Sequence, residues 1–172
     1  MPDDPFKPPE TDSSQNPLPP AGPGSPLRAV LMGLAVDIGG TTVLGLVIGA
    51  LYGLQLQGQG LSESEMKDAM AHMPHDSALY VLGILLGALM SVAGGYVCAR
   101  IVRRNEFRTG FVMAGCSVLF GILSSAADDP ADMLLLFTLA TIACNLLGVK
   151  FGAEHNRRAE APAAAAKDAS TP

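Results

Sequence analysis

One carboxylate inside an apolar segment is the side chain of this chain best placed to do chemistry. Asp37 lies near the middle of residues 29–53, a stretch that contains no other charged residue. An apolar run of about 18 residues or more is typical of a transmembrane helix. An ionisable side chain inside such a helix faces the bundle interior or a water-filled cavity, and it often marks an ion or proton pathway.

Other polar residues of the apolar segments lie at a similar depth. Asp37 is nine residues from Arg28, and Ser91 is nine residues from Arg100 on a segment that runs the opposite way. At the helical rise per residue, both lie about 13 Å inside the segment ends. The sequence therefore predicts one intramembrane polar layer, formed by Asp37, Thr41, Ser91, Tyr96, Ser117, Thr141 and Asn145.

Two functions are compatible with this layer. In the favoured interpretation, Asp37 is hydrogen-bonded to Ser91, Thr41 or Asn145 and ties helices together, which stabilises a membrane bundle only modestly. In the alternative, Asp37 binds a proton or a cation in a small ion- or proton-coupled transporter. Because the layer holds one carboxylate and no basic partner, such a transporter would need a second chain.

A second group of residues, three methionines and two histidines between positions 66 and 75, resembles a set of soft-metal ligands. Thioether and imidazole ligands suit Cu(I), but their spacing here matches no known ligand pattern. We favour a short amphipathic helix at residues 63–73, opened by a Ser62–Glu65 capping box and resting on the bilayer surface. We predict no metal site and no cofactor, and the rejected set is Met66, Met70, His72, Met73 and His75.

Neither the cysteines nor any motif indicates catalysis. Cys98, Cys116 and Cys144 show no CxxC spacing, so we predict small buried apolar residues rather than disulfides or zinc ligands. The sequence holds no catalytic triad, HExxH, phosphate loop or carboxylate pair, so we predict that the protein is not an enzyme and has no catalytic residue. The net charge of −5 argues against a nucleic-acid partner.

The elements that must position Asp37 are four apolar segments. Each is long enough to cross a hydrocarbon core of about 30 Å. The predicted fold is an all-α four-helix transmembrane bundle in residues 28–152, between a disordered Pro-rich tail at 1–27 and a disordered or weakly helical Ala/Pro-rich tail at 153–172. The predicted spans are residues 29–53, 77–99, 107–127 and 133–151.

Small residues recur every four positions in the first two spans. Such ridges let two helix backbones approach closely, as in a glycine zipper. We predict that spans one and two pack as an antiparallel pair along Gly33, Gly45, Gly49 and Gly53 of the first span and Gly83, Gly87 and Gly95 of the second.

Charge distribution predicts the orientation in the membrane. Ten of the 11 Lys and Arg residues fall in the tails and in the loop between spans two and three. Because positively charged loops stay in the cytoplasm, both termini are expected there.

The end of the second span carries a recognisable pattern. The segment from Gly94-Gly95-Tyr96 through Arg100 to Thr109-Gly110 resembles small four-span bacterial membrane proteins of unknown activity, in which Gly-Gly-Tyr-x-Ala-x-Arg leads to a His-Gly pair. Thr109 stands in place of that His. The resemblance implies a multi-pass protein of the bacterial inner membrane and supplies no activity.

Together these observations favour a structural or accessory membrane subunit. Its partners are expected to be the lipid bilayer and either further copies of itself or a larger membrane complex.

Overall fold

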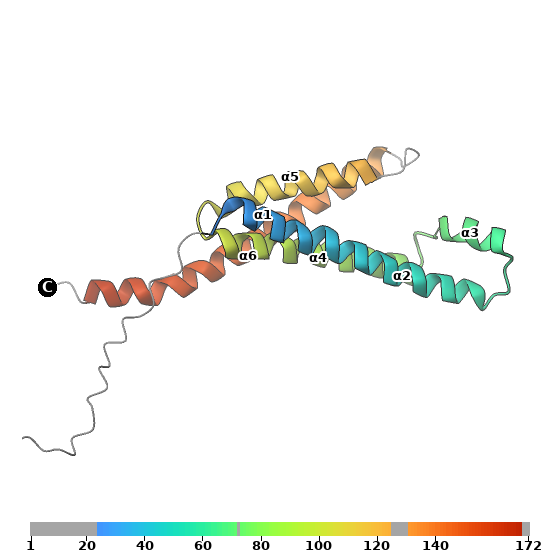
Figure 1. Ribbon diagram of the computed structural model, residues 1–172, viewed down its shortest axis with the longest axis horizontal. Coiled ribbons are helices and arrows are strands. Elements are labelled where there is room, and N and C mark those ends of the chain that lie inside the picture. The colour runs from blue at the N-terminus through green and yellow to red at the C-terminus, as the bar shows by residue number, and fades with distance from the viewer. Residues whose placement is uncertain (1–23, 72, 125–130, 170–172) are drawn as a thin grey trace, which may run out of the picture.

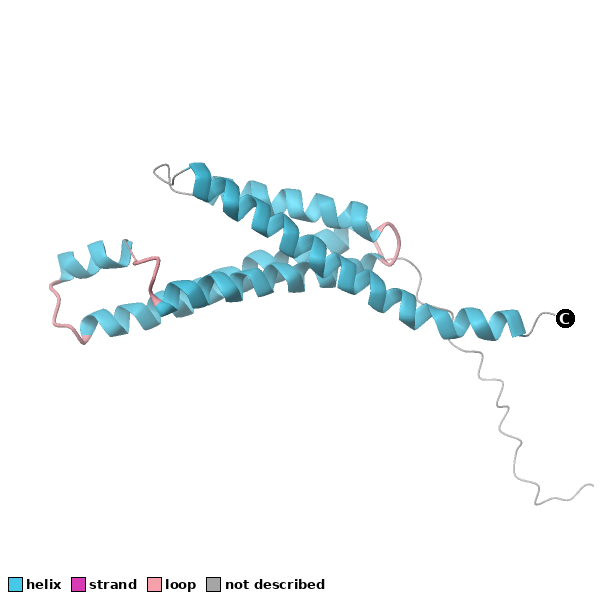
Figure 2. Cartoon of the chain, turned by 180° about the vertical axis from the view of Figure 1, so that it is seen from behind, coloured by secondary structure: helices cyan, strands magenta, loops and turns pink. Residues whose placement is uncertain are grey.

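The computed structural model describes residues 24–71, 73–124 and 131–169. Within these ranges the chain is helical, with connecting turns and no strand (Figures 1 and 2). The elements are α1 (Pro26–Leu34), the π-helical turn η1 (Ala35–Gly39), α2 (Gly40–Gln57), α3 (Glu63–Ala71), α4 (Ala78–Val102), α5 (Glu106–Ser124) and α6 (Ala131–Ala169).

Four helices are long and apolar enough to cross a membrane. They are the continuous helix Pro26–Gln57, made of α1, η1 and α2, then Ala78–Val102, Glu106–Ser124 and Ala131–Ala161. Their outward faces carry large aliphatic side chains that are mostly exposed, among them Leu46 at 71% and Leu123 at 76%. The predicted all-α four-helix transmembrane bundle is thus confirmed, and the protein is a multi-pass membrane protein.

The structure differs from the prediction at the C-terminal end. Helix α6 continues to Ala169 as one helix of 39 residues, whereas the sequence predicted a disordered or weakly helical tail from residue 153. Two features explain the difference. Ala153 and Asn156 are buried, and an Ala-rich segment with high helix propensity extends a helix that is already formed. The predicted N-terminal tail lies outside the described residues up to residue 23.

The bundle has a tight half and an open half. In the tight half, α1, the end of α4, the start of α5 and the middle of α6 converge around Ala29, Cys98, Val102 and Met113 (Figure 1). In the open half, α2 and the start of α4 form one arm, and the end of α5 with the start of α6 forms the other (Figures 1 and 2).

Glycines set the close approaches of the tight half. A Cβ on Gly94 would come within 2.7 Å of the Gly33 carbonyl oxygen, so α1 and α4 touch backbone to backbone. A Cβ on Gly148 would overlap the Val92 carbonyl, and one on Gly95 would overlap the Asn145 carbonyl. The closest backbone contacts of α4 are therefore shared between α1 and α6.

The predicted ridge pairing is correct only in part. Gly33 does meet α4, and Gly83 and Gly87 face Ile48 and Thr41 of the first span. The assignment of Gly95 was wrong, because this glycine packs against α6. Gly45 and Gly49 were also misassigned, because a Cβ at either would meet no atom within 4 Å; Gly53, farther along α2, is half-buried. The two arms separate beyond Asp37, so Gly45 borders the space between them and does not contact α4 closely.

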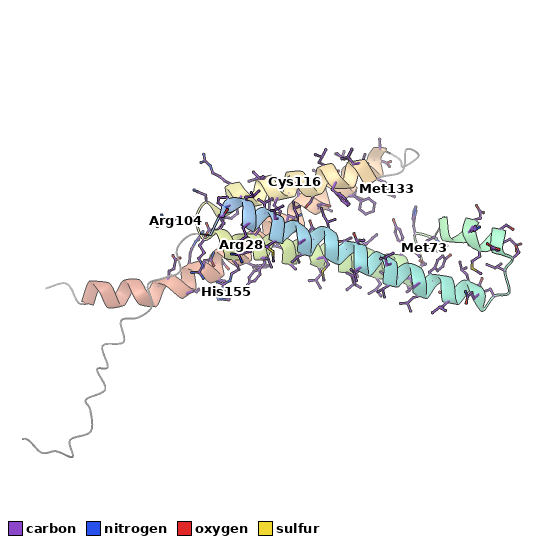
Figure 3. All side chains as sticks on the ribbon, viewed as in Figure 1. Arg28, Met73, Arg104, Cys116, Met133 and His155 are labelled. Atoms are coloured by element: carbon purple, nitrogen blue, oxygen red, sulfur yellow. The ribbon has the colours of Figure 1, made fainter. Side chains whose placement is uncertain are left out.

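The two ends of the bundle differ in chemistry. Arg28, Arg104 and His155 lie at the tight end, and Met73 and Met133 lie at the open end (Figure 3). At the open end, α3 begins with the predicted capping box, in which the Ser62 N–H donates to Glu65 Oε2 at 2.9 Å. The Ser62 hydroxyl also donates to this oxygen, at 2.6 Å, and these bonds lower the pKa of Glu65.

We expect Gly148→Ala to destabilise the bundle by about 1–3 kcal/mol, because the added methyl group has only backbone to displace. Gly115→Ala is the matched control, since a Cβ on this exposed α5 glycine meets no atom within 4 Å. Reversible unfolding in mixed micelles measures both variants. Equal stability of the two variants would contradict the packing described for α4 and α6.

Candidate functional site

The backbone around Asp37 departs from regular α-helix. Asp37 is the central residue of the π-helical turn η1, and its side chain is 4% exposed. Single π-helical turns within α-helices occur frequently at functional sites. Two threonine hydroxyls support the turn, with Thr41 Oγ1 donating to the Asp37 carbonyl at 2.6 Å and Thr42 Oγ1 to the Ile38 carbonyl at 2.7 Å. These bonds matter because a backbone carbonyl in lipid has no water to bind.

The Asp37 carboxylate joins all four spans. Ser91 Oγ of α4 donates to Asp37 Oδ1 at 2.7 Å, and Ser117 Oγ of α5 donates to Oδ2 at 2.6 Å. Asn145 Nδ2 of α6 approaches Oδ2 at 3.4 Å. Ser91, Ser117 and Asn145 are all buried, so these bonds form away from the bundle surface. Hydrogen bonds of this kind, with an ionisable acceptor, are stronger than those between neutral groups.

Asn145 is fully buried, and only its nitrogen is engaged. Besides Asp37, Nδ2 donates to the Thr141 carbonyl at 3.0 Å. Its carbonyl oxygen Oδ1 is buried and has no hydrogen-bond partner among the described residues. Turning the amide over would place that oxygen against two acceptors, so the contacts fix which atom is the nitrogen. The cluster thus contains one polar oxygen without a partner, an unusual feature of a buried site.

The structure brings together most, but not all, of the predicted polar layer. Ser91, Ser117 and Asn145 contact the Asp37 side chain, while Thr41 and Thr141 contribute through contacts within their own helices. Tyr96 was wrongly included. Its hydroxyl forms a hydrogen bond of 2.9 Å with His155 Nδ1, on the part of α6 that lies beyond residue 151. The predicted end of span four at residue 151 left His155 outside the bundle, which hid this pair.

A second buried polar group was not predicted. Asn156 of α6 is 3% exposed; its Nδ2 donates to the Ala99 carbonyl at 2.9 Å, and its Oδ1 accepts from Arg100 Nη1 at 2.9 Å. Glu106 Oε1 lies 3.5 Å from the same amide nitrogen. The signal available in the sequence was a lone Asn one turn beyond Gly152. It is meaningful only if α6 continues past residue 151.

A cavity of about 540 Å³ separates the two arms of the open half and reaches the Asp37 cluster. Its wall is mainly aliphatic and aromatic, with polar side chains at the cluster and, farther along the arms, Thr42, Tyr80 and Ser124. Those that the site uses are Asp37, Thr41, Ser91, Ser117 and Thr141. A smaller cavity of about 290 Å³ between α5 and α6 shares Ser117 and Thr141 with it.

The soft-metal set does not assemble into a centre that the structure can show. His72 lies outside the described residues, Met73 lines the larger cavity, and the His75 ring lies against Tyr80 at 4.8 Å. Within the described part of the chain, no three His, Cys, Asp or Glu side chains are grouped to hold a metal ion.

Comparisons of this chain with protein-family models, curated proteins and solved structures found no match. The resemblance to the Gly-Gly-Tyr membrane proteins therefore stays a prediction.

We expect Ser117→Ala to lower the free energy of unfolding by about 1 kcal/mol, because Asp37 Oδ2 keeps only the longer contact to Asn145. Cys116→Ala is the matched control, since Cys116 is exposed on the same helix and does not line the cavity. Unfolding in mixed micelles measures the difference. A loss of the same size in both variants would mean that the bond to Asp37 is not what matters at position 117.

Proposed function

We propose that this protein is a non-enzymatic membrane subunit that associates with a second copy of itself along the open half of α2. The observation that carries the proposal is the small-residue ridge of Gly45 and Gly49, where an added Cβ would meet no atom of the chain within 4 Å and where Gly45 lies at the edge of the cavity between the arms. Helix association in lipid depends on close backbone approach, and small residues spaced by four provide it. A ridge that pairs with its own copy gives a closed two-fold interface.

The rest of the bundle supports this role. The Asp37 bonds and the glycine contacts fix the relative positions of the four spans in the tight half. The α2 surface is therefore presented on a scaffold that is already ordered, which lowers the conformational cost of association.

We propose further that the protein resides in a bacterial inner membrane with both termini in the cytoplasm. The support is the gathering of arginines at the tight end, where Arg28, Arg100 and Arg104 lie near the loop after α4. The bacterial setting rests on the Gly-Gly-Tyr resemblance.

Replacing Gly45 and Gly49 together by Leu is expected to weaken self-association by roughly tenfold or more, equivalent to about 1.4 kcal/mol. The leucine side chains would hold the two backbones apart, and an added Cβ at either position meets no atom of the chain within 4 Å. Energy transfer between labelled copies in liposomes, diluted with lipid, measures the equilibrium.

Gly115→Leu is the control for this experiment. Gly115 is exposed and open like Gly45, but its neighbours four residues away are Phe111 and Leu119, so it forms no small-residue ridge. A wild-type chain that stays monomeric at high protein-to-lipid ratio would refute self-association.

A second candidate function is a small cation- or proton-coupled transporter. It is favoured by one observation: the cavity between the arms ends at a carboxylate held in a π-helical turn. The two candidates differ in whether that cavity contains water.

The native cysteines provide the test. Cys144 lines the cavity, Cys116 is exposed on the outside of α5, and Cys98 is buried in the tight half. In variants that keep one cysteine each, the transporter candidate predicts that a small membrane-impermeant thiol reagent labels Cys144 rapidly and spares the other two. Thiol reagents react with thiolate, which forms in water and not in lipid. If Cys144 reacts no faster than Cys116, the cavity is dry and the transporter candidate fails.

A further inference from the structure

The Asp37 cluster contains a carboxyl group that no positively charged side chain accompanies. Its three hydrogen-bond donors are two hydroxyls and one amide, all neutral. The nearest arginines along the two helices, Arg28 and Arg100, are nine residues from Asp37 and Ser91, or about 13 Å along the helix axis. A carboxylate withdrawn from water is costly unless a positive charge accompanies it.

The same cluster presents oxygen atoms with free lone pairs. Asn145 Oδ1 is buried without a partner, in the same amide group whose nitrogen approaches Asp37. The hydroxyl groups of Ser91 and Ser117 each donate one hydrogen bond to the carboxylate, and their oxygens keep lone pairs for another contact. A carboxylate, an amide carbonyl and two hydroxyls form an all-oxygen set, which hard cations prefer.

The charge of the set selects the class of cation. Among the groups that contact this cluster, Asp37 supplies the only carboxylate, and no cluster of three acidic, His or Cys side chains exists in the described residues. One negative charge is balanced by one monovalent cation, whereas Ca²⁺ and Mg²⁺ sites are usually built around more carboxylate charge or a phosphate ligand.

Access to the cluster is through the open half of the bundle. Asp37, Ser91 and Ser117 all line the cavity of about 540 Å³, so a cation entering between the arms would meet these three side chains. Asn145 lies behind them, on the tight side, where its backbone packs against Gly95.

We propose that Asp37, Ser91, Ser117 and Asn145 form a binding site for a monovalent alkali cation such as Na⁺. The bound cation balances the carboxylate and accepts coordination from Asn145 Oδ1, the one oxygen that the protein leaves without a partner. The site links all four spans, so its occupancy stabilises the bundle whether or not two copies associate.

Thermal unfolding of the full chain in uncharged detergent tests the site. The protein is compared in NaCl, KCl and choline chloride at one ionic strength and one pH. Because a ligand that binds only the folded state raises the Tm, we expect Na⁺ or K⁺ to raise it over choline by about 5 °C or more at saturation. Asp37→Asn should abolish this difference, and Asn145→Ala should reduce it. Cys116→Ala, on an exposed part of α5 outside the cavity, should leave it unchanged.

Each possible result of this experiment either supports or overturns the cation site. A Tm that is identical in the three chlorides overturns the proposal, as does a Tm that rises on acidification without any cation effect, which would assign a proton to Asp37. A cation effect that persists in Asn145→Ala and Asp37→Asn also overturns it, because the ion would then bind elsewhere. If Asp37→Asn does not fold, the wild-type comparison together with Asn145→Ala and Cys116→Ala still decides the question. The association measured with the Gly45 and Gly49 variants is a separate readout, so either proposal can fail without the other.

Discussion

The arrangement of this bundle depends on one buried carboxyl group that is hydrogen-bonded to three other helices. Asp37 sits in the middle of an apolar span, and its two oxygens are satisfied by side chains from the three other spans. In lipid the usual hydrophobic drive for helix packing is absent, so polar contacts and close backbone approach must hold the helices together. Asp37 supplies the polar contacts and fixes the depth in the membrane at which all four spans meet. The π-helical turn is the local adjustment that accompanies this placement, with Thr41 bonding to the carbonyl of Asp37 itself.

Close backbone approach occurs only on one side of that level. Gly33, Gly94 and Gly148 bring α1, α4 and α6 into backbone contact in the tight half. Beyond Asp37 the first span carries Gly45 and Gly49 without a facing helix, and the arms diverge around the large cavity. The same residue type therefore has two consequences in one helix. Where a partner helix lies opposite, glycine shortens the distance between backbones, and where none does, it leaves open space beside the helix.

The sequence predicted much of this architecture because its strongest signals are local or depend on depth. Four apolar segments specify four spans, and similar distances from the basic residues at the span ends place Asp37, Ser91, Ser117 and Asn145 in one polar layer. Depth alone does not reveal which face of a helix meets which neighbour. Gly95 was therefore assigned to the first span although it packs on α6, and Tyr96 was assigned to the layer although it bonds His155. The extent of α6 was underestimated because hydropathy ends at the span. The contacts that continue the helix, such as Asn156 with the Ala99 carbonyl, are tertiary.

The position of the Asp37 cluster connects the two proposals made for this protein. It lies where the tight half ends and the arms begin to separate, so any change in its contacts acts first on the angle between the arms. Ser117 lies on one arm and Ser91 on the other, and the carboxylate is the group that holds both. A cation at this point would draw the oxygens of both arms toward one centre, whereas an unbalanced charge would favour separation and hydration. A structural tie and an ion site are for this reason compatible uses of the same four side chains.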